Sequence, residues 1–230
     1  MSMNNADKKD KPDLLRQMAS VVSHEIRNPL AIISNSLYFI KTRLAAGGAA
    51  VDPKVTKHMG IIEGEVKRSN DVMEEILAFT RTRELILAPA HMNAGIDDLA
   101  GSYPLPPGIT LKTAPDAGDP RVIVDIEAVR YALRCVMANA VQAMPEGGTV
   151  TLECTHDDKT GYLSVTDSGP GLPDGDGEKA FEPFFTTRPR GIGLGLTIAR
   201  KYFEQHGGTA KAENAPGGGA KITVSLPLVK

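Results

Sequence analysis

The chain has 230 residues, a formal net charge of −2 at pH 7 and an apolar fraction of 41%. This length is enough for one large domain or two small ones, and the apolar fraction excludes a disordered chain. The near-neutral charge argues against a basic nucleic-acid surface, and the absence of Trp argues against base-stacking platforms. We therefore expect a folded protein that does not bind nucleic acid.

The sequence gives no sign of export or of membrane insertion. Residues 1–13 are polar and lack the apolar core of a signal peptide. No stretch approaches the roughly 20 apolar residues that span a bilayer. Cys135 and Cys154 stand among apolar residues without partners at zinc-ligand spacing, which predicts two reduced, packed thiols. We expect a cytoplasmic chain, whether it is a whole protein or the core of a longer one.

The first third of the sequence predicts a long helix over residues 11–46. Its apolar positions step by three and four, at Leu15, Met18, Val22, Ile26, Pro29, Ile33, Leu37, Ile40 and Leu44. This spacing is close to an 11-residue repeat, at about 3.67 residues per turn. So long and narrow a stripe needs partner helices along its whole length.

A second helix is predicted over residues 53–83. Glycines at 47 and 48 break the first helix, Asp52 can cap the second one, and Pro53 suits its first position. The apolar stripe of the second helix follows a heptad pattern through Val55, Met59, Ile62, Val66, Ser69, Met73, Ile76 and Thr80. One hairpin over residues 14–84 cannot bury both stripes, so we expect a homodimeric four-helix bundle.

The rest of the chain predicts a separate α/β domain over residues 92–230, after a linker over residues 85–91 that contains Pro89. We expect helices over 93–100, 125–144 and 193–205, and strands over 109–113, 149–155, 162–167, 209–213 and 221–226. Residues 168–190 are rich in Gly, Pro and Asp and predict a long functional loop. This order favours an α/β sandwich with a mixed, mostly antiparallel sheet and helices on one face.

His24 lies in the long helix, two residues from the apolar stripe on either side, and therefore points to solvent. An exposed His on a helix is usually only solvated, but its neighbours favour chemistry. Glu25 can accept the imidazole proton, which makes the other ring nitrogen nucleophilic. Asn28, one turn along, can position a water molecule. Pro29 removes an amide donor, so a kink is expected just past His24.

These residues resemble the phosphoacceptor box of two-component sensor histidine kinases, His-Glu-x-x-Asn-Pro-Leu. The resemblance implies that His24 is phosphorylated and that Glu25 is its acid/base partner. It also implies that Asn28 is needed to dephosphorylate a response regulator.

Four further segments carry candidate nucleotide-binding residues. Asn139 lies in a helix, where an amide is ordinarily a satisfied core group, and Asp167-Ser168-Gly169-Pro170-Gly171 alone reads as a turn after a strand. The segment 181–188 contains an unusual pair of loop phenylalanines, which suggests a hinge. The glycines of segment 191–196 open a helix, where free amides can face phosphates, although small-residue helix packing also explains them.

In this order and spacing, the four segments look like the ATP-binding domain shared by histidine kinases and gyrase-type ATPases. The resemblance implies that Asn139 ligates Mg²⁺ and that Asp167 accepts a hydrogen bond from the adenine amine. The residues implied to bind ATP are Asn139, Asp167, Gly169, Gly171, Thr187, Arg188, Arg190, Gly191, Gly193, Leu194 and Gly195. The implied protein is an ATP-dependent autokinase that passes a phosphoryl group from His24 to a response-regulator Asp, and that also acts as a phosphatase of that regulator.

Two departures from the family pattern leave alternatives open. Cys135 stands where many of these kinases have a second Asn, and Arg188 and Arg190 replace a common Lys near the glycines. A gyrase-type ATPase would need a Glu at position 135 to activate water, and it would leave the His24 box unexplained. A dimeric scaffold that has lost ATP turnover would not need the nucleotide motifs.

Overall fold

The computed structural model describes residues 7–46, 52–81, 84–173, 177–188 and 191–229, with only the backbone described for residues 7–22, His24 and Glu25. The chain divides into two compact units, Met1–Thr82 and Arg83–Lys230, and each is considered separately.

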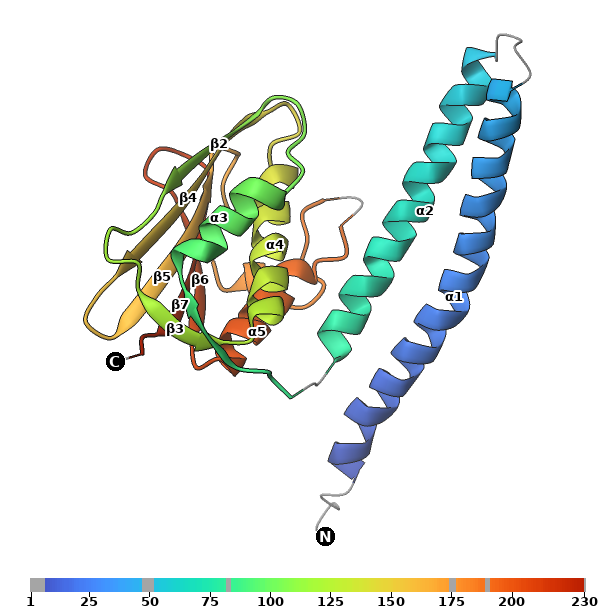
Figure 1. The fold of residues 1–230 in the computed structure, drawn as a ribbon. Helices are drawn as coiled ribbons and strands as arrows, with labels where there is room; N and C mark the ends of the chain where they lie inside the picture. The colour runs from blue at the N-terminus through green and yellow to red at the C-terminus, as the bar shows by residue number, and fades with distance from the viewer. Residues whose placement is uncertain (1–6, 47–51, 82–83, 174–176, 189–190, 230) are drawn as a thin grey trace. The chain divides into compact units, whose positions relative to one another are not determined.

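The first unit is an antiparallel helical hairpin of α1 (Asp7–Ala46) and α2 (Pro53–Thr80) (Figure 1). The Oδ1 atom of Asp52 accepts a hydrogen bond from the Lys54 amide at 2.8 Å, and Pro53 opens α2. The predicted cap is therefore confirmed. The helix α1 begins earlier than expected and continues through Pro29 as one helix, so the kink there stays a prediction.

Among the side chains that the structure describes, the hairpin buries one row of each apolar stripe and leaves another row exposed. The side chains buried between the two helices are Leu37, Met59, Val66 and Met73. A second row stays between 42% and 47% exposed, at Ile26, Ile33, Ile40, Val55 and Ile62. Two exposed ion pairs link the helices, with Arg27 2.6 Å from Glu74 and Lys41 2.8 Å from Glu63. Each helix thus carries an apolar row that its own hairpin does not cover.

The second unit contains a five-stranded sheet in the order β2-β4-β5-β7-β6. The strands are β2 (Ile109–Ala114), β4 (Gly148–His156), β5 (Thr160–Asp167), β6 (Thr209–Asn214) and β7 (Ala220–Pro227). The pair β2–β4 is parallel and the other pairs are antiparallel. The expected mixed, mostly antiparallel sheet is confirmed.

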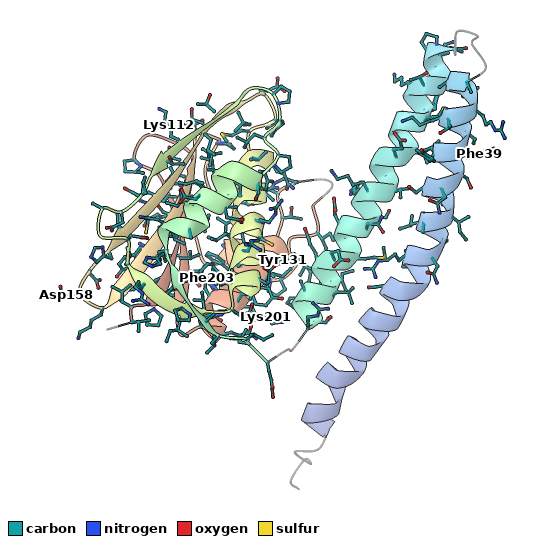
Figure 2. All side chains as sticks on the ribbon, viewed as in Figure 1. Phe39, Lys112, Tyr131, Asp158, Lys201 and Phe203 are labelled. Atoms are coloured by element: carbon teal, nitrogen blue, oxygen red, sulfur yellow. The ribbon has the colours of Figure 1, made fainter. Side chains whose placement is uncertain are left out.

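Three helices cover one face of this sheet: α3 (Asn93–Ser102), α4 (Ile126–Gln142) and α5 (Gly195–Gln205) (Figure 1). A short 3₁₀ helix, η2 (Lys179–Phe181), precedes the loop that leads to α5. The core fills the space beneath the helices, where Phe203 of α5 is fully buried (Figure 2). The helix α4 buries one apolar face in this core, at spacings of one, three and four residues. The buried residues of α4 are Ala128, Ala132, Leu133, Val136, Met137 and Ala140.

The prediction that residues 85–91 form a linker without secondary structure is wrong for residues 88–91. Residues Ala88–His91 form strand β1, which pairs antiparallel with β3 (Arg121–Val124) in a separate two-stranded sheet. Pro89 lies opposite Ile123 there. A strand tolerates proline at a sheet edge, where no amide donor is needed on the open side, and both strands of this pair are edges.

In the part of the chain that the structure describes, no helix has the length and apolar character to cross a membrane.

Candidate functional site

Asp167 ends the central strand β5 and is 3% exposed. Its Oδ1 atom accepts hydrogen bonds from the backbone amides of Gly169, at 2.9 Å, and Ala220, at 3.2 Å. These two bonds fix the carboxylate, and within the described part of the chain they leave Oδ2 to accept from a ligand.

Two glycines near Asp167 allow close contacts that a side chain would block. A Cβ on Gly219, where φ is +86°, would lie 1.9 Å from the carbonyl oxygen of Asp167. A Cβ on Gly171, where φ is +82°, would lie 2.6 Å from Oδ1 of Asn214. Only glycine fits such positions without strain. Gly171 was expected at the site and Gly219 was not, although its place in a run of three glycines is a signal for a close backbone approach.

Asn139 lies in the last turn of α4 and is hydrogen-bonded to an arginine of a nearby loop. The guanidinium of Arg188 donates to Oδ1 and to the backbone carbonyl of Asn139, and to Oε1 of Gln142. A cation is favourable at a helix C-terminus because the last carbonyls carry partial negative charge. The structure therefore brings together two predicted residues, Asn139 and Arg188. It adds Gln142, whose signal is its place three residues after Asn139 on the same helix face.

A backbone hydrogen bond joins the two ends of the loop that carries Arg188. The Phe184 amide donates to the carbonyl of Gly193 at 3.0 Å. A Cβ on Gly193, where φ is +73°, would lie 2.4 Å from the carbonyl oxygen of Phe185, so only glycine allows this contact. Within the loop, the Gly191 amide donates to the Arg188 carbonyl at 3.3 Å. Thr187 is exposed, and Arg190 lies outside the described residues.

The start of α5 presents backbone amides. Leu194 is the N-cap residue, its side chain is 1% exposed, and it makes no side-chain capping bond in the described structure. The first amides of α5 are thus not satisfied by its cap and can bind an anion. Gly195 packs on α4, since its Cβ position lies 3.9 Å from Cβ of Cys135. The glycine run therefore adjoins the helix that carries Asn139.

The phenylalanines of segment 181–188 differ in their surroundings. Phe181 is buried, with the Arg200 guanidinium 3.9 Å from its ring centre, and belongs to the core. Phe185 is half-buried. Phe184 is 64% exposed, and its φ of 67° is unusual for a residue with a side chain. Of the pair Phe184 and Phe185, only Phe184 is exposed, so Phe184 is the phenylalanine that remains a candidate for the suggested hinge.

His24 and Glu25 lie within α1, but their side chains are outside the described structure. Their direction therefore stays a prediction. The neighbouring Ser23 is buried and Asn28 is exposed. The described residues contain no group of three or more His, Cys, Asp or Glu side chains that could hold a metal ion. Of the predicted site residues, Asn139 offers an amide oxygen, a ligand type that Mg²⁺ accepts.

Two family models match the chain in succession. Residues 14–85 match the His Kinase A (phospho-acceptor) domain. Residues 124–230 match the histidine kinase-, DNA gyrase B-, and HSP90-like ATPase. Asn139, Asp167 and the glycine run fall within the second match, and His24 falls within the first.

The chain is similar to sensor kinases along nearly all of its length. It is 32% identical over 227 residues to the sensor histidine kinase ZraS of Klebsiella oxytoca, covering 96% of this chain and 48% of that protein. It is 26% identical over 227 residues to sporulation kinase C of Bacillus subtilis, covering 97% of this chain and 51% of that protein. The chain spans about half the length of these curated relatives.

Solved structures share the fold. The crystal structure of histidine kinase ThkA in complex with response regulator protein TrrA matches with a TM-score of 0.64 and 28% identity, covering 96% of this chain and 64% of that one. Full-length ShkA in complex with AMPPNP matches with a TM-score of 0.74 at 24% identity, covering 93% of this chain and 46% of that one, and shows the fold alone.

The second unit is thus an ATPase fold of the class shared by histidine kinases, DNA gyrase B and HSP90, and a phospho-acceptor domain precedes it. This combination identifies the chain more closely. It belongs to the two-component sensor histidine kinases, as the catalytic core of such a protein.

Proposed function

We propose that this chain is an ATP-dependent protein-histidine autokinase that phosphorylates His24. The observation that carries the proposal is the presence, in one chain, of a phospho-acceptor match that contains His24 and an ATPase match that contains Asp167 and Asn139. The gyrase-type alternative needs a general base at position 135, where this chain has Cys.

Asp167 recognises the adenine of ATP. Its Oδ1 is used by two backbone amides, and Oδ2 accepts a hydrogen bond from the exocyclic amine. Glycines at 169, 171 and 219 let the base approach the backbone closely.

Asn139 would hold Mg²⁺ through its amide oxygen, an appropriate ligand for a hard cation that retains waters and phosphate oxygens. Its Oδ1 atom fits a cation, because the guanidinium of Arg188 already binds there. When bound, the metal neutralises charge that develops on the phosphates. A bound metal would take the Asn139 oxygen to which Arg188 donates here, which would leave Arg188 available to the phosphate oxygens. The amides of Gly193, Leu194 and Gly195, with Thr187 and Arg190, complete the phosphate contacts. Gly191, whose amide donates to the Arg188 carbonyl, shapes the loop beside them.

Transfer is an in-line displacement at the γ-phosphorus. A ring nitrogen of His24 forms the new N–P bond as the bond to the β–γ bridging oxygen breaks, and ADP leaves. Glu25 accepts the proton from the other ring nitrogen. The protein contributes mainly positioning and charge neutralisation.

The phosphoryl group then passes to an Asp of a response regulator that docks on the hairpin. The likeness to ThkA, whose structure was solved in complex with a response regulator protein, supports this partner. Asn28 is exposed on α1, where its amide can position water for dephosphorylation of the regulator. We assign this phosphatase role to Asn28 and not to Glu25.

The hairpin forms a homodimer. Each helix leaves a row of apolar side chains uncovered, with Ile33 44% and Ile62 42% exposed. Two hairpins can bury these rows against each other in a four-helix bundle.

Incubation with ATP labelled on the γ-phosphate tests the proposal. We expect acid-labile, alkali-stable label on the protein, as for a phosphohistidine. Rapid release of labelled phosphate without protein-bound label would support the ATPase alternative. Failure to bind nucleotide would support a scaffold that has lost turnover.

A further inference from the structure

A buried carboxylate bonds the start of the second unit to the helix that carries Asn139. Asp125 is the N-cap of α4 and is 3% exposed. Its Oδ1 atom accepts from the Ala128 amide at 3.0 Å, which is the expected capping bond. Its Oδ2 atom accepts from the backbone amide of Ile86 at 3.0 Å, 39 residues earlier in the chain. Ile86 lies in the segment that leads from the hairpin into β1.

The end of α5 meets the same aspartate. His206 is the C-cap residue of α5 and is 8% exposed. Its Nε2 atom accepts from the backbone amide of Asp125 at 2.9 Å, and its Nδ1 atom lies 2.6 Å from the carbonyl oxygen of Tyr202. Because the Asp125 amide is a donor and the Tyr202 carbonyl is an acceptor, the two bonds fit a ring in which Nε2 accepts and Nδ1 donates.

Ile86, Asp125 and His206 together form what we call the linker clamp. An aromatic contact supports it, because Tyr131 of α4 (labelled in Figure 2) packs edge-on to Tyr202 of α5, with ring centres 6.2 Å apart. The clamp lies at the N-terminus of α4 and the C-terminus of α5. The candidate site uses the opposite end of each helix. Asp125 thus bonds to the linker and to both helices that present the site. Its carboxylate bonds to Ile86 and caps α4, and its backbone amide bonds to His206 of α5.

We propose that Asp125 is a positioning residue for phosphoryl transfer, because its second carboxylate oxygen fixes the path of the segment that joins the phosphoacceptor hairpin to the ATP-binding unit. This inference rests on the proposed autokinase function. Helix capping needs only one side-chain oxygen, as serine caps show, so capping does not explain the bond to Ile86. Transfer requires the reacting atoms to approach within a narrow range of distance and direction, so a loosened linker slows it.

Three variants separate this role from simple support of the fold. Ile86→Pro removes the amide donor, whereas Ile86→Ala keeps it and shortens a side chain that is 78% exposed. Asp125→Ser keeps a good cap but lacks the second oxygen. We expect Ile86→Pro and Asp125→Ser to lower the rate of label incorporation at saturating ATP roughly tenfold, with the nucleotide Kd changed by less than about twofold. Ile86→Ala should match the unmodified protein. The double variant should be no worse than either single variant, because both remove one bond.

Hydrogen exchange at the Ile86 amide gives a readout that does not depend on activity. In the nucleotide-free protein this amide should exchange slowly, and Asp125→Ser should speed its exchange. The proposal is overturned if both variants keep the full rate of labelling, or if the nucleotide Kd weakens in step with the rate, as for a merely structural residue. Absence of label on the unmodified protein would contradict the autokinase assignment instead, and exchange at Ile86 would still test the clamp.

Discussion

Among single residues, Asp167 carries the most specific chemical claim. Asp167→Asn can keep the amides of Gly169 and Ala220 bonded through its carbonyl oxygen, but it replaces the other acceptor with a donor. We expect ATP to bind about 10- to 100-fold more weakly, the range for a lost hydrogen bond to a charged group. A purine triphosphate without the exocyclic amine should lose much less. Calorimetric titration measures both, and equal losses would show that Asp167 does not recognise the amine.

The two cysteines should differ sharply in reactivity. Burial raises the pKa of the Cys154 thiol to about 11, and this residue is 2% exposed. At pH 8 only about one Cys154 in a thousand is then a thiolate, the reactive form. We expect iodoacetamide to modify half-buried Cys135 first in the native protein, and both residues in denaturant, as measured by mass spectrometry. Equal native rates would contradict the burial of Cys154 in β4.

Local signals explain which parts of the candidate site could be predicted from the sequence. Asp167 and Asn139 stand in short motifs whose order is readable along the chain. The contact of Arg188 with Gln142 joins segments 46 residues apart, and that of Asp125 with His206 joins segments 81 residues apart. No pattern within either segment reports such a partner, so these contacts required the fold.

At the scale of helices, the uncovered row of the hairpin predicts its partner. Ile33→Glu should place a charge in the dimer interface and convert the dimer to monomer, because burying an unpaired carboxylate is strongly unfavourable. Tyr38→Glu is the matched control, since Tyr38 is 72% exposed and lies away from the row. Analytical ultracentrifugation of the full chain measures both variants. A dimer that survives Ile33→Glu, or a monomeric unmodified protein, would refute the bundle.

Sequence patterns predicted the hairpin helices better than they predicted the two shortest strands. The hairpin helices are long, periodic and, for α2, capped by Asp52, so their existence followed from local sequence. Strands β1 and β3 have four residues each, and β1 contains Pro89. Such strands exist because they pair with each other, and alternation over four residues is too short to identify them.

This correction has a measurable consequence for where the second unit begins. A fragment of residues 92–230 lacks β1 and leaves the buried Oδ2 of Asp125 without the Ile86 amide, whereas a fragment of residues 84–230 keeps both. An unsatisfied buried acceptor costs about 1–3 kcal/mol. We expect the shorter fragment to melt at least about 5 °C lower, as measured by calorimetry. Equal melting temperatures would mean that β1 adds nothing to the stability of this unit.

For the whole molecule, the proposed phosphoryl transfer depends on two units of the chain. In the proposed function the helical hairpin supplies the acceptor, His24, and the sheet-containing unit binds the donor, ATP. Neither unit suffices for autophosphorylation, whereas nucleotide binding should depend on the second unit alone. A substitution at the acceptor should therefore abolish labelling without weakening ATP binding.

The most direct test is the labelling of His24→Ala with γ-labelled ATP, beside a control, His58→Ala, at an exposed histidine of α2. We predict that His24→Ala takes up no acid-labile label, yet binds ATP within about threefold of the unmodified protein, since an interaction absent from binding cannot change Kd. His58→Ala should label normally. Acid-labile label retained on the His24→Ala protein would contradict the central claim.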